Sequence, residues 1–254
     1  MKKLLLSFIS FLVAFLVWAE KPVFKNKFFP NGNLMYEGYF VNNHPVGVLK
    51  RYHENGKIKA FQEFISKDTV RFEYFAGDGC KVAKGLFVKE KKHGVWEYFT
   101  CDDHLLMLEK YDNGWKQGEA LVFSKEGVVI DRMNYQNDVL HGKRIQYYSY
   151  GSVLAKYAYK EGLLDGEYES YYETGQKDEQ GFYLANKKHG VWTVYKEDGT
   201  IETVEYEHGI ATNQTELDRR LQEQMDKNEQ GDASIQDPQD YIENPDAYLM
   251  LFRQ

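Results

Sequence analysis

Proline is scarce in this chain, and the motifs of catalysis are missing. Only 5 of the 254 residues are Pro, which excludes a proline-rich linker protein. The sequence has no phosphate-binding loop, and no Ser or Cys stands in a nucleophile motif. Asp102, Asp103 and His104 fall at a turn tip, where Asp is expected for turn chemistry alone. We therefore expect a protein that is not an enzyme and that uses no cofactor.

Basic patches are also missing. The formal net charge is −7, and residues 211–254 alone hold 10 acidic and 4 basic residues. This balance argues against nucleic acid as a partner and disfavours membrane association. Aromatic residues are abundant instead, with 20 Tyr and 16 Phe, and these residue types favour β-strands.

The segment 1–19 is typical of a signal peptide. Lys2 and Lys3 precede the apolar run Leu4–Val17, which is short for a membrane span. We expect cleavage after Ala19 and export to the periplasm, the outer envelope or the extracellular space. The alternative is an uncleaved anchor.

Internal repeats decide the fold class. Glycines recur at a spacing of 24 residues in two series, one from Gly94 to Gly190 and one from Gly127 to Gly199. The second series continues toward the N-terminus as Gly79, Gly56 and Gly32, with one 23-residue step, and Asp103 fills the slot between Gly79 and Gly127. The first aromatic column comprises Phe28, Tyr52, Phe75, Phe99, Phe123, Tyr147, Tyr171 and Tyr195. The second comprises Phe40, Phe64, Phe87, Tyr111, Tyr135, Tyr159, Tyr183 and Tyr206. We interpret both columns as structural, because aromatic cross-strand pairs stabilise a sheet.

Each repeat has the parts of a β-hairpin. Turn sequences such as Asn31-Gly32 and Asp198-Gly199 tolerate the positive φ that tight hairpin turns require. Two strands and two turns use up the whole repeat, so it has no room for a helix. The sequence therefore predicts an all-β fold over residues 20–210, an elongated antiparallel meander of about eight stacked hairpins.

The repeat resembles the MORN repeat, especially the divergent bacterial variant that includes proteins labelled as YwqK-type antitoxins. Tyr36–Asn43 matches the Tyr-x-Gly-x-aromatic-x-x-Asn core, and His93–Tyr98 and His189–Tyr195 match the Gly-x-Trp-x-x-Tyr start. In other repeats, Ala120 and Arg144 occupy the Trp slot. The resemblance implies scaffolding and association with proteins or membranes.

Three tryptophans lie outside the aromatic columns and are the ligand candidates: Trp96, Trp115 and Trp192. His93, His141 and His189 recur once in every two repeats. Four strands at about 4.8 Å each place neighbouring histidines about 19 Å apart, too far to share one metal ion. We therefore interpret these histidines as loop residues and expect no metal site.

The two cysteines, Cys80 and Cys101, are predicted to form a disulfide, because an exported protein meets an oxidising compartment. They flank a polar connection that makes their strands antiparallel neighbours. Residue numbers that pair across it have a constant sum, and Cys80–Cys101 share that sum with Phe87–Gly94. One register would thus join the cysteines and lay Phe87 over Gly94. The alternative is two free thiols.

Residues 211–254 form a separate acidic tail. Thr215 begins a capping-box pattern, and Leu217, Leu221 and Met225 follow at helical spacing, which predicts a short amphipathic helix over 215–226 packed on the last hairpin. Residues 228–240 are polar and acidic and are predicted to be flexible. The apolar residues 248–252 either join the helix or dock a partner.

Three functions follow from these features. The leading hypothesis is a non-enzymatic exported scaffold whose sheet mediates protein–protein interaction at the cell envelope. The second is a surface that binds glycan or peptidoglycan through exposed aromatic residues. The third is an antitoxin-like neutralising protein, ranked last because a cytoplasmic toxin would need no exported partner. The sequence leaves open the partner, the binding face and the oligomeric state.

Overall fold

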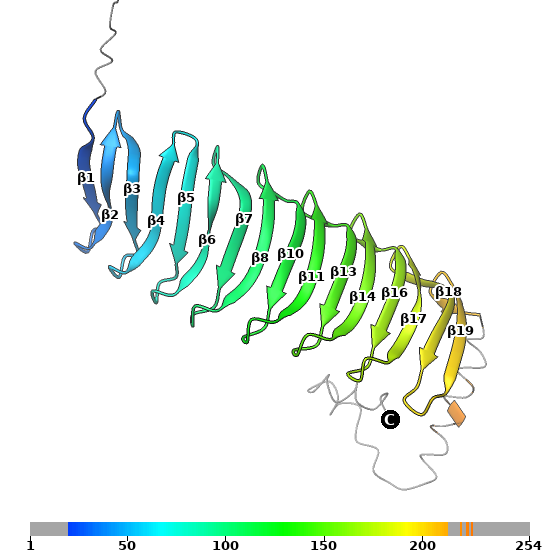
Figure 1. Ribbon diagram of the computed structural model, residues 1–254. Coiled ribbons are helices and arrows are strands. Elements are labelled where there is room, and N and C mark those ends of the chain that lie inside the picture. The colour runs from blue at the N-terminus through cyan, green and yellow to red at the C-terminus, as the bar shows by residue number, and fades with distance from the viewer. Residues whose placement is uncertain (1–19, 213–218, 220–221, 224, 226–254) are drawn as a thin grey trace, which may run out of the picture. The chain divides into compact units, whose positions relative to one another are not determined.

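A computed structural model describes residues 20–212 and, beyond them, residues 219, 222, 223 and 225. These residues contain 20 β-strands that pair antiparallel in one open sheet, so the predicted all-β hairpin meander is confirmed (Figure 1). Among the described residues, no helix is long and apolar enough to span a bilayer.

The chain divides into two compact units. The first contains residues up to Leu154 and Tyr159–Gly162; the second contains Ala155–Ala158 and residues from Leu163 onward. The strands of the first unit are β1 (Val23–Phe28), β2 (Leu34–Val41), β3 (His44–Tyr52), β4 (Ile58–Ser66), β5 (Thr69–Phe75), β6 (Lys81–Val88), β7 (Lys91–Phe99), β8 (Leu105–Asp112), β9 (Trp115–Lys116), β10 (Gly118–Phe123), β11 (Val129–Gln136), β12 (Val139–Leu140) and β13 (Gly142–Tyr147). Strand β14 (Val153–Lys160) contributes to both units. The second unit continues with β15 (Leu163–Leu164), β16 (Gly166–Tyr171), β17 (Lys177–Leu184), β18 (Lys187–Tyr195), β19 (Ile201–Glu207) and β20 (Ile210–Ala211).

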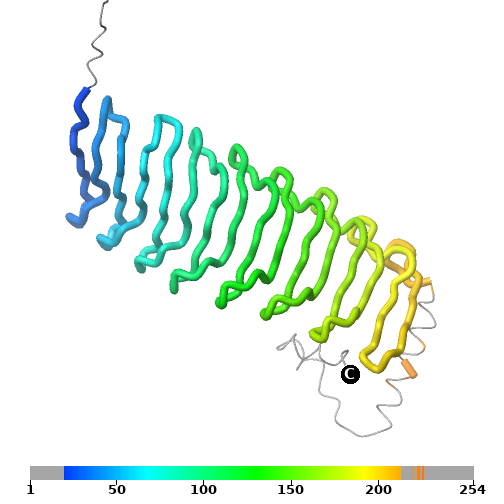
Figure 2. The backbone as a smooth tube through the Cα atoms, viewed as in Figure 1, coloured from blue at the N-terminus to red at the C-terminus, as the bar shows by residue number. Residues whose placement is uncertain are grey.

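Two kinds of turn alternate along the first unit, at opposite ends of the strands (Figure 2). The lower turns carry the second glycine series, the one that includes Gly127 and Gly199. In the turn Ser124–Val128, the Ser124 N–H donates to Val128 O at 2.7 Å and Gly127 has φ +80°. Asp103 takes the glycine position of its turn with φ +62°, as its place in the repeat predicts. The upper turns, except the one between β4 and β5, have two residues at positive φ, such as Asn42 and Asn43, the type I′ geometry that matches strand twist.

The two faces of the sheet in the first unit differ in chemistry because successive residues of a strand point to opposite sides. One face, the aromatic face, carries the second aromatic column together with Phe72 and Trp96. The other, the ion-pair face, carries the first column and cross-strand ion pairs. Lys84 lies 3.0 Å from Glu97, and Arg132 lies 2.8 Å from Glu119.

A register shift separates the two halves of the β6–β7 pair. Ala83 pairs with Tyr98, in the register predicted from the cysteines, but Phe87 pairs with Lys92 and not with Gly94. The prediction that Phe87 lies over Gly94 is therefore wrong. Gly94 has φ +69°, and the irregularity that begins there places extra residues on β7.

The register shift brings Trp96 over Gly85. A Cβ at Gly85 would lie 2.4 Å from the indole of Trp96, so only glycine admits the ring. In the second unit, Gly181 lies under Trp192 in the same way, and a Cβ at Gly181 would lie 2.2 Å from the indole. Both indoles are buried, at 3% and 1% exposure, and each N–H donates to a strand carbonyl at 3.1 Å. These tryptophans are thus the core of an otherwise thin sheet.

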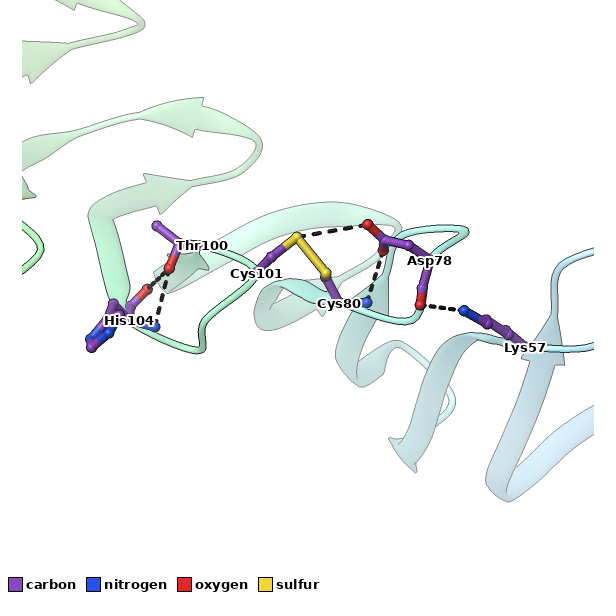
Figure 3. Close-up of a disulfide and its surroundings, with 6 residues drawn as sticks. All are labelled: Lys57, Asp78, Cys80, Thr100, Cys101 and His104. Atoms are coloured by element: carbon purple, nitrogen blue, oxygen red, sulfur yellow. Dashed lines mark hydrogen bonds between the residues drawn. A yellow bond between two sulfur atoms is a disulfide. The ribbon is translucent and has the colours of Figure 1, made fainter.

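Cys80 and Cys101 are joined by a disulfide with a Cα–Cα distance of 4.9 Å (Figure 3). They lie in neighbouring lower turns, just outside β6 and β7. Asp78 holds the first turn by accepting from the Cys80 N–H at 3.0 Å, and Lys57 Nζ of the preceding repeat donates to Asp78 O at 2.6 Å. Consecutive lower turns are therefore joined first by a hydrogen bond and then by the disulfide.

Most of the acidic tail lies outside the described residues. This holds for most of the predicted helix at 215–226, for the stretch 228–240 and for the apolar residues 248–252. Among the residues described there, Met225 is half exposed.

Candidate functional site

A groove of about 1120 Å³ lies in the first unit, where three consecutive upper turns meet the aromatic face. Phe64 and Val70 of the β4–β5 hairpin, with Phe72 and Phe87, contribute its apolar floor. All four side chains are half-buried, so each keeps a surface that a ligand can cover.

The groove coincides with a change in the repeat. The corresponding strands of the adjacent repeats, β3 and β7, each carry a bulge glycine at positive φ, Gly47 and Gly94, whereas β5 has Val70 and Arg71 at that place. The turn between β4 and β5 has no residue at positive φ, unlike the turns on either side. The sequence contained this signal as the single shorter step in its glycine series, from Gly56 to Gly79, but our sequence reasoning did not connect that step with a site.

The rim of the groove is polar and of mixed charge. It comprises Asn42, His44, Ser66, Lys67, Asp68, Lys89 and Glu90. The backbone holds two rim turns together, since the Lys89 N–H donates to Asp68 O at 2.6 Å. An apolar floor with a polar rim is the usual composition of a protein-binding patch.

Trp96 braces the floor from one side. Its ring centroid lies 5.0 Å from that of Phe87 and 6.4 Å from that of Phe72, and Phe72 and Phe87 meet edge to face at 5.5 Å. Edge-to-face and tilted contacts of this kind contribute about 0.5–1.5 kcal/mol beyond area burial. The floor is therefore built from side chains with fixed positions.

A polar network covers the other side of Trp96. Lys92 Nζ lies 4.5 Å from the indole centroid and donates to the Tyr98 hydroxyl at 2.7 Å. Tyr111 donates to the buried Glu109 carboxylate at 2.6 Å, and Lys116 Nζ lies 2.5 Å from the same group. The network links the three strands β7, β8 and β9 beside the groove.

The pKa values of the network follow from burial and from these bonds. Burial lowers the pKa of Lys92, against the attraction of Glu109. Burial raises the pKa of Tyr98 to about 12. For Glu109, burial alone would raise the pKa, but the bonds from Lys116 and Tyr111 outweigh it and leave the pKa below its ordinary value. At neutral pH, Glu109 is thus a buried carboxylate held ionised by its partners.

The three tryptophans that were predicted to bind a ligand differ in their exposure to solvent. Trp96 and Trp192 are core residues whose burial removes them from the ligand candidates. This burial could not be predicted from the Trp slot alone, because the indole is covered only where a glycine of the preceding strand lies beneath it. Trp115 is 55% exposed at the start of β9 and stays a candidate.

The recurring histidines do not converge in the described part of the chain. His93 Nδ1 lies 3.5 Å from Asp112 Oδ1, and the His189 ring lies 5.9 Å from that of His208. One group of three possible metal ligands occurs among the described residues, Asp78 with Cys80 and Cys101, and both of its sulfurs belong to the disulfide.

Three segments of the chain match the family described as MORN repeat variant, at residues 26–42, 45–60 and 164–185. No curated protein matches the chain. Among solved structures, it is similar to one described as "Crystal structure of GtfA/B complex bound to UDP and GlcNAc", with 14% identity and a TM-score of 0.23. That match covers 53% of this chain and 26% of the other, about a quarter of its length, and so low a TM-score carries no argument.

Proposed function

Because this chain carries MORN-variant repeats, we propose that it is an exported, non-enzymatic scaffold that binds a protein partner at the cell envelope. The observation that carries the proposal is the groove on the aromatic face of the first unit. The partner contributes apolar side chains that cover Phe64, Phe72 and Phe87.

The chemistry of the two faces favours the aromatic one. On the ion-pair face, several charged side chains already have cross-strand partners, as Lys50 has Glu37 at 3.4 Å. Covering such pairs removes solvation and adds little attraction. Covering the groove floor removes apolar surface from water at about 25 cal/mol per Å², and aromatic residues often dominate binding energy.

Two features support export. The segment 1–19 has the charge and apolar pattern of a signal peptide. The Cys80–Cys101 disulfide suits an oxidising compartment such as the periplasm or cell exterior. Together they favour a partner in the envelope.

Capture from envelope extract of the native host tests the proposal, with two matched variants. Phe64→Ala removes a groove-floor ring from β4. Phe61→Ala removes a ring from the same strand but on the ion-pair face, where Phe61 meets Phe75 at 5.6 Å. We expect a stoichiometric protein that wild type and Phe61→Ala retain and that Phe64→Ala loses. Equal loss in both variants, or loss only in Phe61→Ala, would contradict the assignment of the face.

The same extract separates the other hypotheses. Retention on cell-wall polysaccharide, lost on Trp115→Ala, would replace the protein partner with a glycan that stacks on this exposed indole. A co-purifying toxin, neutralised on binding, would support the antitoxin-like role.

A further inference from the structure

The first strand of the sheet leaves one edge open. Strand β1 pairs with β2 on one side, and no described strand pairs with its other side. Val23, Phe24 and Phe28 are 58%, 50% and 54% exposed. Repeat stacks usually end in polar terminal repeats, and an exposed apolar edge strand is an association site.

Like the outer edge of β1, the outer edge of β19 is largely open. Strand β19 pairs with β18 along its length, but on the outer side β20 covers only Tyr206 and Glu207, and the Thr212 N–H donates to Glu205 O at 2.8 Å. Among the described residues, Ile201–Val204 has no strand there. Ile201 is 62% exposed, and Glu202 and Thr203 are exposed as well.

The repeat fixes how one hairpin pairs with the next. In every case, the residue four positions before a second-column aromatic pairs with the residue just before the following first-column aromatic. The seven pairs are Tyr36–Arg51, Ala60–Tyr74, Ala83–Tyr98, Met107–Val122, Asp131–Gln146, Ala155–Ser170 and Glu179–Val194. Strand β19 supplies the next residue of this series, Glu202, and β1 supplies a first-strand residue with no such partner, Lys27.

We propose that copies of this chain associate head to tail, with β1 of one copy adding to the outer edge of β19 of the next. The repeat rule then pairs Lys27 of one copy with Glu202 of the next. The adjacent pairs are Phe28 with Ile201 and Asn26 with Thr203. The interface thus joins opposite charges, covers two exposed apolar side chains and extends the ladder in the register used within the chain.

Charge argues against the alternative, in which two copies of β1 pair with each other. Such a pair would gather Lys25 and Lys27 of both copies on one sheet face, and like charges on neighbouring strands repel. Strand β19 instead carries Glu202, Glu205 and Glu207 and no basic residue. Lys196 is the present partner of Glu202, at 2.6 Å, and both side chains are half exposed, which leaves the carboxylate accessible to a second cation.

A cysteine pair tests the register in the full chain. In Asn26→Cys with Thr203→Cys, the two thiols of neighbouring copies lie opposite each other, and Cβ atoms at such positions are about 4.5–5.5 Å apart, close enough for a disulfide. Asn26→Cys with Val204→Cys is the matched control, because its thiols are out of register and on opposite faces. We expect disulfide-linked multimers in the first variant only, with a linkage between positions 26 and 203. The multimeric fraction should increase with protein concentration.

Charge reversal tests the Lys27–Glu202 pair. Sedimentation velocity over a range of concentrations should show that Lys27→Glu and Glu202→Lys each weaken self-association about tenfold or more, and that combining them restores it. Both side chains are exposed, so melting temperatures should not change. A strictly monomeric wild type, equal cross-linking in both cysteine pairs, or a 26–26 disulfide in Asn26→Cys alone would each overturn the proposal.

Discussion

Gly85→Ala tests whether the thin sheet is held together by an indole seated on a glycine. The added Cβ would lie 2.4, 2.5 and 2.7 Å from three atoms of the Trp96 ring. Ordinary van der Waals contact begins near 3.4 Å, so the ring must move by about 1 Å. Trp96 is 3% exposed and contacts Phe72, Phe87 and Tyr111, so it has little room to do so.

We expect Gly85→Ala to lower the free energy of unfolding by about 2–3 kcal/mol, the upper range for an overpacked core. Urea unfolding followed by tryptophan fluorescence and circular dichroism would measure the change. Gly77→Ala is the control, because a Cβ there meets nothing within 4 Å and the backbone φ is not in the left-handed region. It should be neutral or slightly stabilising.

A double-mutant cycle isolates the contact. Trp96→Ala should itself cost about 3–5 kcal/mol, as deletion of a buried indole usually does. In that background, Gly85→Ala should cost less than about 1 kcal/mol, because the ring that opposes the methyl group is gone. If Gly85→Ala proves as stable as Gly77→Ala, or equally destabilising with and without Trp96, the reasoning is refuted.

Four further predictions concern other parts of the chain. Cys80→Ser with Cys101→Ser should lower stability by roughly 3 kcal/mol, and thiol titration of the unreduced monomer should find no free thiol. Glu109→Gln should cost about 2 kcal/mol at pH 7. Because the folded pKa of Glu109 lies below its ordinary 4.5, this difference should hold above pH 4.5 and close as the pH falls through the folded pKa. Ala185→Asn should stabilise by about 1 kcal/mol, because Ala185 sits at φ +49° in an upper turn. Intact mass of protein from the native host should show Glu20 as the first residue.

The periodic features of the fold were visible in the sequence because each is a local requirement. A hairpin turn needs positive φ, so glycine recurs at that position, and Asp103 could be placed in the same series before its φ was known. The separation of Cys80 and Cys101 likewise reflected the pairing of neighbouring strands. Because such requirements act locally and recur in every repeat, they appear in the sequence as residue types at a fixed spacing.

The features that depend on two repeats at once were harder to predict. The shift at Gly94 changes which residue faces Phe87, and no spacing within one repeat reveals it. Burial of Trp96 depends on Gly85 in the preceding strand, so the Trp slot alone suggested a ligand residue. The groove lies where β5 lacks the bulge glycine that β3 and β7 carry, a difference that matters only when three upper turns lie side by side.

The aromatic face of the first unit is the surface that we propose for binding a protein. Hydroxyl-radical footprinting of the chain with and without the captured partner tests this proposal most directly, because it reports the solvent access of individual rings. We expect the partner to protect Phe64 and Phe87 and to leave Phe61 and Phe75 as reactive as in the free chain. Protection of Phe61 and Phe75 with Phe64 and Phe87 unchanged would contradict it.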